Sequence, residues 1–89
     1  MRFEWDRRKA DANLAKHGVS FDEAASVFFD GLSATIPDPD HSIGQERYIT
    51  MGVSSMGRLL VVAHAETASA LRIISARPAS ASERKRYED

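Results

Sequence analysis

The chain has 89 residues and contains no cysteine, only three prolines and only one tryptophan. Without cysteine there is no disulfide framework, no thiolate nucleophile and no zinc finger, and the composition fits a reducing cytosol. The longest apolar run, Leu59 to Ala63, is far below the roughly 20 residues that cross a bilayer. The N-terminus also lacks the apolar stretch of a signal peptide. We therefore expect a cytoplasmic protein without membrane contact, built as one domain over residues 1–89.

Basic residues are missing from the middle of the chain. Residues 20–46 carry six acidic groups and no lysine or arginine, whereas residues 1–19 carry five basic and three acidic groups. Residues 47–89 carry seven basic and four acidic groups. The formal net charge is only -1, yet a local cationic face is compatible with this distribution, and the acidic segment would lie away from that face. An ordinary solvated mix of charges is the alternative.

The first third of the sequence predicts a short strand at residues 2–5 and then two helices. Asp6 can cap the first helix, and Gly18 can supply its left-handed stop. Ser20 begins a capping box for the second helix, which Gly31 ends. Its apolar residues recur at helical spacing, so one stripe must pack on another element. This stripe consists of Phe21, Ala24, Ala25 and Phe28.

The rest of the chain predicts strands and one more helix. The strand candidates are residues 32–36, 46–54, 58–66 and 70–76. Short links between the last three indicate antiparallel neighbours, and residues 58–66, apolar on both faces, form the central strand. Ser80 begins a second capping box for a short helix that ends near Tyr87. We therefore predict an α+β fold: a small antiparallel sheet, two N-terminal helices packed on one face, and a short C-terminal helix.

The last predicted strand carries the residues of greatest chemical interest. It contains Arg72 and runs into Arg77 and Pro78, so Arg77 sits at a corner. Across an antiparallel connection His64 or Glu66 would lie near Arg72, with the faces set by a register that the sequence does not give. Such a cluster suits metal-free RNA cleavage, in which the ribose 2′-OH loses a proton, arginines hold the phosphate and the 5′ oxygen gains a proton.

The predicted catalytic residues are therefore His64, Glu66, Arg72 and Arg77, which we expect to meet in one solvent-open hollow. Histidine titrates near neutral pH and can move protons, and the arginine fork donates two parallel hydrogen bonds to a phosphate. The alternative interpretation is a salt-bridge network at the edge of the sheet.

A second group of residues could bind the RNA backbone. Lys16 and His17 could instead face the dipole of the first helix, and Arg47 could instead pair with Glu46. Arg84 and Tyr87, one turn apart, could instead only pack the last helix. The predicted RNA-binding residues are Lys9, Lys16, His17, Arg47, Arg84 and Tyr87.

Asp38, Asp40 and His41 are the only grouping that invites comparison with a metal site. A loop with two prolines readily uses aspartate as a turn acceptor, and no second cluster at ligand spacing accompanies it. We therefore expect neither a metal nor another cofactor.

Four stretches, in this order, resemble one family: "FEWD", "NLAKHGVSFDEAASVFFD", "IPDPDHSIGQERYITMG" and "RIISARPASASERKRY". They resemble the BrnT toxins of bacterial type II toxin-antitoxin systems over essentially the whole chain. The resemblance implies a RelE-like ribonuclease that cleaves RNA without a metal and is neutralised by a BrnA-like antitoxin. That partner would carry a ribbon-helix-helix module, so DNA would be bound only through the complex. A non-catalytic binding module, whose basic face binds an acidic protein or nucleic acid, is the alternative.

Overall fold

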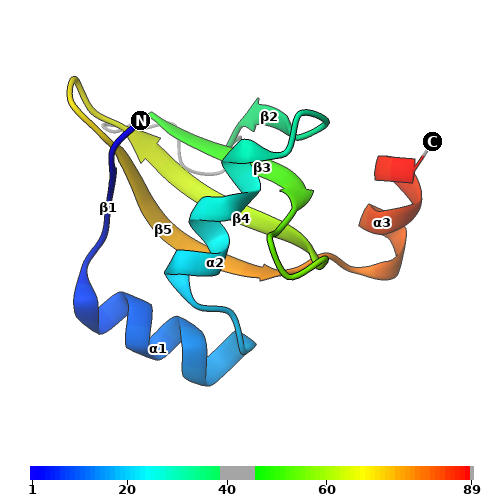
Figure 1. Ribbon diagram of the computed structural model, residues 1–89, viewed down its shortest axis with the longest axis horizontal. Helices are drawn as coiled ribbons and strands as arrows, with labels where there is room; N and C mark the ends of the chain where they lie inside the picture. The colour runs from blue at the N-terminus through cyan, green and yellow to red at the C-terminus, as the bar shows by residue number, and fades with distance from the viewer. Residues whose placement is uncertain (39–45, 89) are drawn as a thin grey trace.

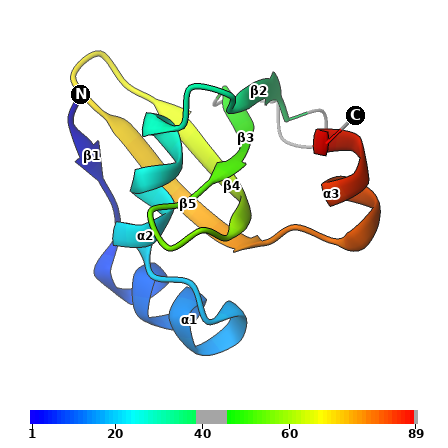
Figure 2. The same cartoon turned by 45° about the vertical axis from the view of Figure 1, so that its right-hand side comes forward.

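The computed structural model describes residues 1–38 and 46–88, which form three α-helices and a five-stranded sheet. The strands are β1 (Phe3–Glu4), β2 (Ala34–Pro37), β3 (Arg47–Val53), β4 (Leu59–Glu66) and β5 (Leu71–Pro78). The helices are α1 (Arg7–His17), α2 (Phe21–Ser26), the 3-10 turn η1 (Val27–Phe29) and α3 (Ala81–Glu88). Figures 1 and 2 show α2 across one face of the sheet, α1 beside it, and α3 near the exit of β5. The predicted α+β class is confirmed.

The helix boundaries follow the predicted caps. The Asp6 side chain accepts hydrogen bonds from the backbone N–H groups at positions 8 and 9, and Gly18 ends α1 with φ of 69°. Ser20 accepts from the Glu23 N–H at 3.0 Å and so caps α2. Helix α2 ends at Ser26, earlier than expected, and the chain continues as η1.

The strands are ordered β1-β5-β4-β3-β2 in the sheet, with β4 at the centre as predicted. Strands β2 to β5 pair antiparallel, but β1 pairs parallel with β5, so the sheet is mixed. A parallel pair needs a long connection rather than a hairpin. The short links between β3, β4 and β5 predicted the pairings of these strands, but they contain no information about the pairing of β1 with β5. Leu60 and Val62 are fully buried on one side of β4, and Leu59 and Val61 are buried on the other.

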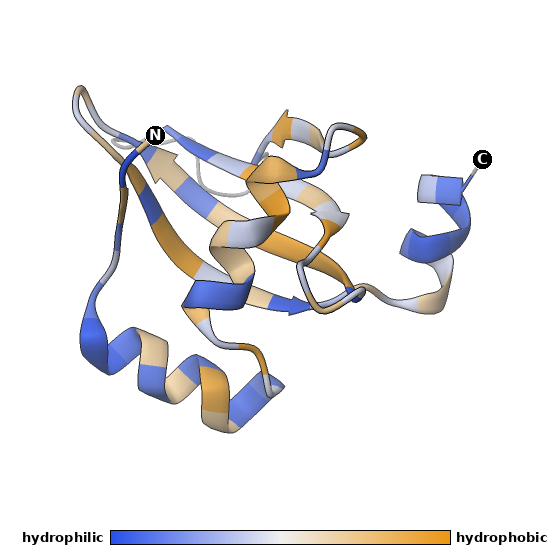
Figure 3. Cartoon of the chain, in the orientation of Figure 1, coloured by the Kyte–Doolittle hydropathy of each residue, from blue (hydrophilic) through white to orange (hydrophobic). Residues whose placement is uncertain are grey.

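We call the side of the sheet that packs against the α1 and α2 layer the front face, and the opposite side the back face. The front face carries the main core, which includes Leu60, Val62 and Ile73 together with Phe21 and Val27 from the helices. Figure 3 shows apolar residues concentrated on β4, β5 and the α2–η1 segment, whereas α3 is mostly hydrophilic. Burial of this apolar surface drives the packing of the helices onto the sheet.

A β-bulge in β5 decides which of its side chains face the back. Ala63 pairs with Ser75, but His64 pairs with Ile73, so Ile74 is an extra residue on β5. After the extra residue the alternation of side chains is reversed. Arg72 and Ser75 therefore lie on the back face, and so does Arg77, which a regular strand would place opposite Arg72.

Asn13 fastens α1 to the outer edge of β5. Its side chain donates to the Ala76 carbonyl at 2.8 Å and to the Val19 carbonyl at 3.0 Å, and accepts from the Ala76 N–H at 3.0 Å. Because β1 pairs only with Leu71 and Arg72, the Asn13 amide takes the place of a neighbouring strand at Ala76.

Within residues 1–38 and 46–88, no helix has the length and apolar character needed to cross a membrane.

Candidate nucleic-acid interface

Two arginines flank a small residue on the back face. Arg47 of β3 and Arg72 of β5 both pair with Ala65 of the central strand, and Glu4 of β1 pairs with Arg72 on the other side. Directly paired residues point to the same face, so these four form one row across the sheet. Two strand spacings, about 10 Å, separate the backbones of the two arginines.

The electrostatic environment of the two arginines differs. The Arg72 guanidinium lies 3.7 Å from the Glu4 carboxylate, and both side chains are partly exposed. Arg47 has no carboxylate partner among residues 1–38 and 46–88, because Glu46 instead accepts a hydrogen bond from the Tyr48 hydroxyl at 2.9 Å. The alternative of an Arg47–Glu46 pair is therefore not what the structure contains.

Arg77 lies further along the same face. It pairs with Val61, four residues from Ala65 on β4, which corresponds to about 13 Å along the strand. Its guanidinium donates to both oxygens of Glu83, at 2.7 and 2.9 Å. This fork, with the Ser80 N–H that also donates to Glu83, lowers the pKa of Glu83 to about 2. Arg77 thus anchors the start of α3 while remaining about 43% exposed.

His64 is a core residue on the front face. It is 1% exposed, its Nε2 lies 2.7 Å from the Thr50 hydroxyl, and its Nδ1 has no partner among the described residues. The Phe28 ring meets it edge-on and the Tyr48 ring stacks on it, with centroids 4.9 and 5.8 Å away. Burial lowers the pKa of His64 to about 4, so the imidazole is neutral at pH 7.

The expectation that His64 and the arginines share one hollow is wrong. Arg72 pairs with Ala65, the residue after His64, and neighbouring strand residues point to opposite faces. Glu66 pairs with Leu71 and also lies on the front side, at the end of the sheet. The sheet therefore separates His64 and Glu66 from Arg72 and Arg77, because the register, which the sequence does not encode locally, decides the faces.

The basic residues of α1 belong to the helix layer rather than to the back-face row. Lys9 and Lys16 are exposed on α1, and His17 is half-buried at its end. Lys16 and His17 lie in the last turn, where positive charge is favourable beside the helix dipole.

Helix α3 brings its residues toward the back face. A hollow of about 200 Å³ separates it from the sheet. The Tyr87 hydroxyl donates to Asp30 at 2.8 Å, and burial together with this bond raises the pKa of Tyr87. Arg84 is exposed and has no acidic partner in the described part of the chain. The hollow is lined by Ala34, Ile36, Ile49, Met51, Arg86 and Tyr87.

In the described ranges, 1–38 and 46–88, no group of three or more histidine, aspartate or glutamate side chains is placed to hold a metal. Asp38 is buried, and its backbone N–H donates to the Arg47 carbonyl at 2.9 Å. Asp40 and His41 lie outside the described residues.

Glu4 is the back-face residue that the sequence did not suggest. It meets Arg72 only because β1 pairs with β5, which joins opposite ends of the chain. The alternating pattern at residues 2–5 predicted a strand, but nothing in it named the partner strand.

Fold and site together describe a small α+β protein whose sheet presents separated guanidinium groups on one face, an arrangement suited to a phosphate backbone. The profile of one family, described as "Ribonuclease toxin, BrnT, of type II toxin-antitoxin system", matches residues 5–83. The chain belongs to this family, as the resemblance of its motifs indicated, and is a ribonuclease toxin of a type II toxin-antitoxin system.

A solved structure agrees with this assignment. The crystal structure of the Brucella abortus ribonuclease toxin, BrnT, superposes with a TM-score of 0.71 at 26% sequence identity. The match covers 90% of this chain and 97% of the Brucella chain. No curated protein matches the sequence.

Proposed function

We propose that this toxin is a metal-independent endoribonuclease that binds and cleaves RNA on the back face of its sheet. The observation that carries the proposal is the row in which Arg47 and Arg72 flank the buried Ala65. Two forked donors at this spacing can hold adjacent oxygens or phosphates of one strand. Arg77 extends the cationic face along β5, and Arg84 extends it onto α3.

The proposed reaction is an internal transesterification. The ribose 2′-oxygen attacks the phosphorus, and its proton passes to the Glu4 carboxylate, which lies beside Arg72. The bond from phosphorus to the 5′ oxygen breaks, and this oxygen takes a proton from water, while the hydroxide that is left takes the proton from Glu4 and restores its carboxylate. The products are a 2′,3′-cyclic phosphate and a 5′-hydroxyl end. Guanidinium groups stabilise the extra negative charge of the phosphorane.

Other carboxylates and the histidine are poorer candidates for the base. Glu83 has both oxygens bound to Arg77 and a pKa of about 2, so it is a weak proton acceptor. His64 is enclosed by Phe28 and Tyr48, and no substrate atom can reach it without opening the core. The proposal therefore assigns His64 to the core and moves the proton transfer to Glu4.

The proposal includes a BrnA-like antitoxin with a ribbon-helix-helix module as the neutralising partner. The support is the family, whose description places its members in type II toxin-antitoxin systems. Operator DNA would then be bound by the antitoxin part of the complex. The toxin would act in the cytoplasm, where its RNA substrate is found.

The proposal is tested by incubating the purified protein with a labelled single-stranded RNA in excess EDTA. We expect shortened products with 2′,3′-cyclic phosphate ends. The double variant Arg47→Ala, Arg72→Ala should cut at least tenfold more slowly, about 1.4 kcal/mol or more in barrier. Arg8→Ala, which removes an exposed arginine of α1, is the matched control and should cut normally. RNA that is shifted in mobility but stays intact would identify a non-catalytic binding module instead.

A further inference from the structure

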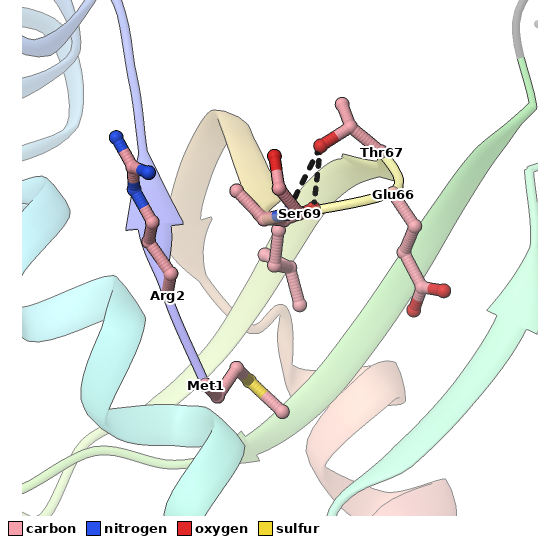
Figure 4. A pocket seen from close by; sticks show the side chains of 7 residues that line it. Met1, Arg2, Glu66, Thr67 and Ser69 are labelled. Carbon is pink, nitrogen blue, oxygen red and sulfur yellow. Dashed lines mark hydrogen bonds between the residues drawn. The ribbon is translucent and has the colours of Figure 1, made fainter.

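A second hollow, of about 250 Å³, lies at the end of the sheet where the β4–β5 turn meets the N-terminus. Figure 4 shows Met1 and Arg2 on one side of it and Glu66 on the other, with Thr67 and Ser69 above. The hollow thus combines apolar, cationic, anionic and hydroxyl groups within one small volume.

Arg2 and Glu66 are the two charged residues of this hollow. Neither Arg2 nor Glu66 has a hydrogen-bond or ion-pair partner for its side chain in the described part of the chain. By contrast, Arg58, Arg72 and Arg77 each contact a carboxylate. With no partner in the described residues, the Glu66 carboxylate and the Arg2 guanidinium at the rim of this hollow are available to a ligand.

The hydroxyl groups differ in their availability. The Thr67 hydroxyl closes the turn, because it accepts from the Ala70 N–H at 3.0 Å and donates to the Ala70 carbonyl at 3.1 Å. Ser69 has no such bond among the described residues. The groups left to contact a ligand are therefore the Arg2 guanidinium, the Glu66 carboxylate and the Ser69 hydroxyl.

The hollow adjoins the row of back-face arginines. Glu66 follows Ala65 on β4, and Leu71, whose N–H donates to the Arg2 carbonyl at 2.8 Å, precedes Arg72 on β5. Since Phe3 packs on the front-face core, strand alternation directs Arg2 to the back, the side of Arg72. The hollow thus spans the end of the sheet, with its cation on the back side and its carboxylate on the front side.

We propose that this hollow binds a guanine base of the RNA substrate, with Glu66 as the specificity-determining residue. The inference rests on the proposed function, and the guanine would belong to the nucleotide beside the scissile phosphate. Arg2 would contact the phosphate of that nucleotide, next to Arg72. Met1 and Leu71 provide the apolar surface against which a base can lie.

Guanine is the base that fits a carboxylate best. A carboxylate offers only acceptors, and guanine alone presents two adjacent donors, N1–H and the N2 amino group, on its Watson–Crick edge. Adenine and cytosine present one donor beside a ring acceptor, and uracil presents one donor between two carbonyls. Each of these bases would therefore place an acceptor atom next to the Glu66 carboxylate, which is unfavourable.

Binding of free nucleotides tests the inference without any cleavage. Titration of the ¹⁵N-labelled protein with GMP, IMP and AMP should give tightest binding for GMP, by about tenfold over IMP and AMP, because each bidentate contact discriminates by roughly that factor or more. Glu66→Gln should remove the preference. Asp22→Asn, which neutralises an exposed carboxylate of α2, is the matched control and should keep it.

Substituted RNA gives a second test that needs no variant. Replacing guanosine at a cleavage site by inosine, which lacks the N2 amino group, should slow cutting about tenfold, whereas 7-deazaguanosine keeps both donors and should be cut normally. Equal binding of GMP and AMP, or cleavage indifferent to inosine, would overturn the inference while leaving the nuclease in place. Selective GMP binding by a protein that cuts no RNA would instead support the inference and contradict the proposed function.

Discussion

Arg72 and Arg77 lie on the same face of the sheet because Ile74 is an extra residue in β5. In a regular strand, residues five positions apart point to opposite sides, and Arg77 would then point toward the helix layer. The bulge instead leaves Ile73 and Ala76 in the core and both guanidiniums on the back face. A local irregularity thus assembles the cationic surface that the proposed nuclease requires.

Arg77 has both an anchoring and a proposed binding role, and two variants separate them. Arg77→Ala and Glu83→Gln both weaken the same ion pair, and each should lower the free energy of unfolding by about 1 kcal/mol, since the pair is partly exposed. Only Arg77→Ala removes the cation, so it should slow RNA cleavage at least tenfold, whereas Glu83→Gln should leave the rate unchanged or raise it. Urea unfolding and single-turnover cleavage measure the two effects. Equal losses of cleavage in both variants would show that Arg77 acts only as an anchor.

The sequence predicted those parts of the fold that local chemistry determines. Caps such as Asp6 and Ser20 act within one helical turn, and β4 is apolar on both sides because it is central. The parallel pairing of β1 and the bulge at Ile74 depend on contacts between distant segments, and no short stretch specifies them. For that reason the sequence names the arginines as candidates but indicates neither the contact of Arg72 with Glu4 nor the burial of His64.

His64 makes stability depend on pH. Its pKa of about 4 in the folded state lies below the ordinary value of 6.5, so the unfolded chain takes up the proton first as the pH falls. The stabilisation is fully present above pH 6.5 and is lost between pH 6.5 and 4, by about 3 kcal/mol in total. Urea unfolding at pH 7.5 and pH 4.5 measures it in the wild type and in His64→Gln, whose amide does not titrate in this range.

The same variant tests whether His64 takes part in the chemistry. Because the ring is buried in the core, His64→Gln should show a smaller loss of stability on acidification than the wild type while still cutting RNA at pH 7.5. If His64→Gln lost as much stability on acidification as the wild type does, this result would contradict the assignment of His64 to the core. A stable variant that no longer cuts RNA would return His64 to the active site.

Glu4 should affect the chemical step rather than the binding of RNA. Glu4→Gln keeps the shape of the side chain but removes the proposed proton acceptor beside Arg72. We expect kcat to fall by a factor of 10² to 10⁴, about the contribution of one general base, with RNA affinity unchanged or slightly higher. Fluorescence anisotropy of a 2′-deoxy-substituted RNA, which cannot be cut, gives the affinity separately. A loss of affinity with an unchanged kcat would mean that Glu4 only positions Arg72.

Asn13 should be among the most costly polar residues to remove. Asn13→Ala breaks three buried hydrogen bonds to the backbone of Ala76 and Val19 and leaves these groups without a partner in the apolar interior. We expect the free energy of unfolding to fall by about 3 kcal/mol, measured by urea unfolding. Lys9→Ala, an exposed site on the same helix, should change the free energy of unfolding by less than about 0.5 kcal/mol.

Since Ala76 precedes Arg77, loosening the contact between Asn13 and Ala76 should also reduce RNA cleavage in the fraction of protein that remains folded. If Asn13→Ala were as stable as Lys9→Ala, the amide would not replace a strand at the edge of β5, and the position of Arg77 would need another cause.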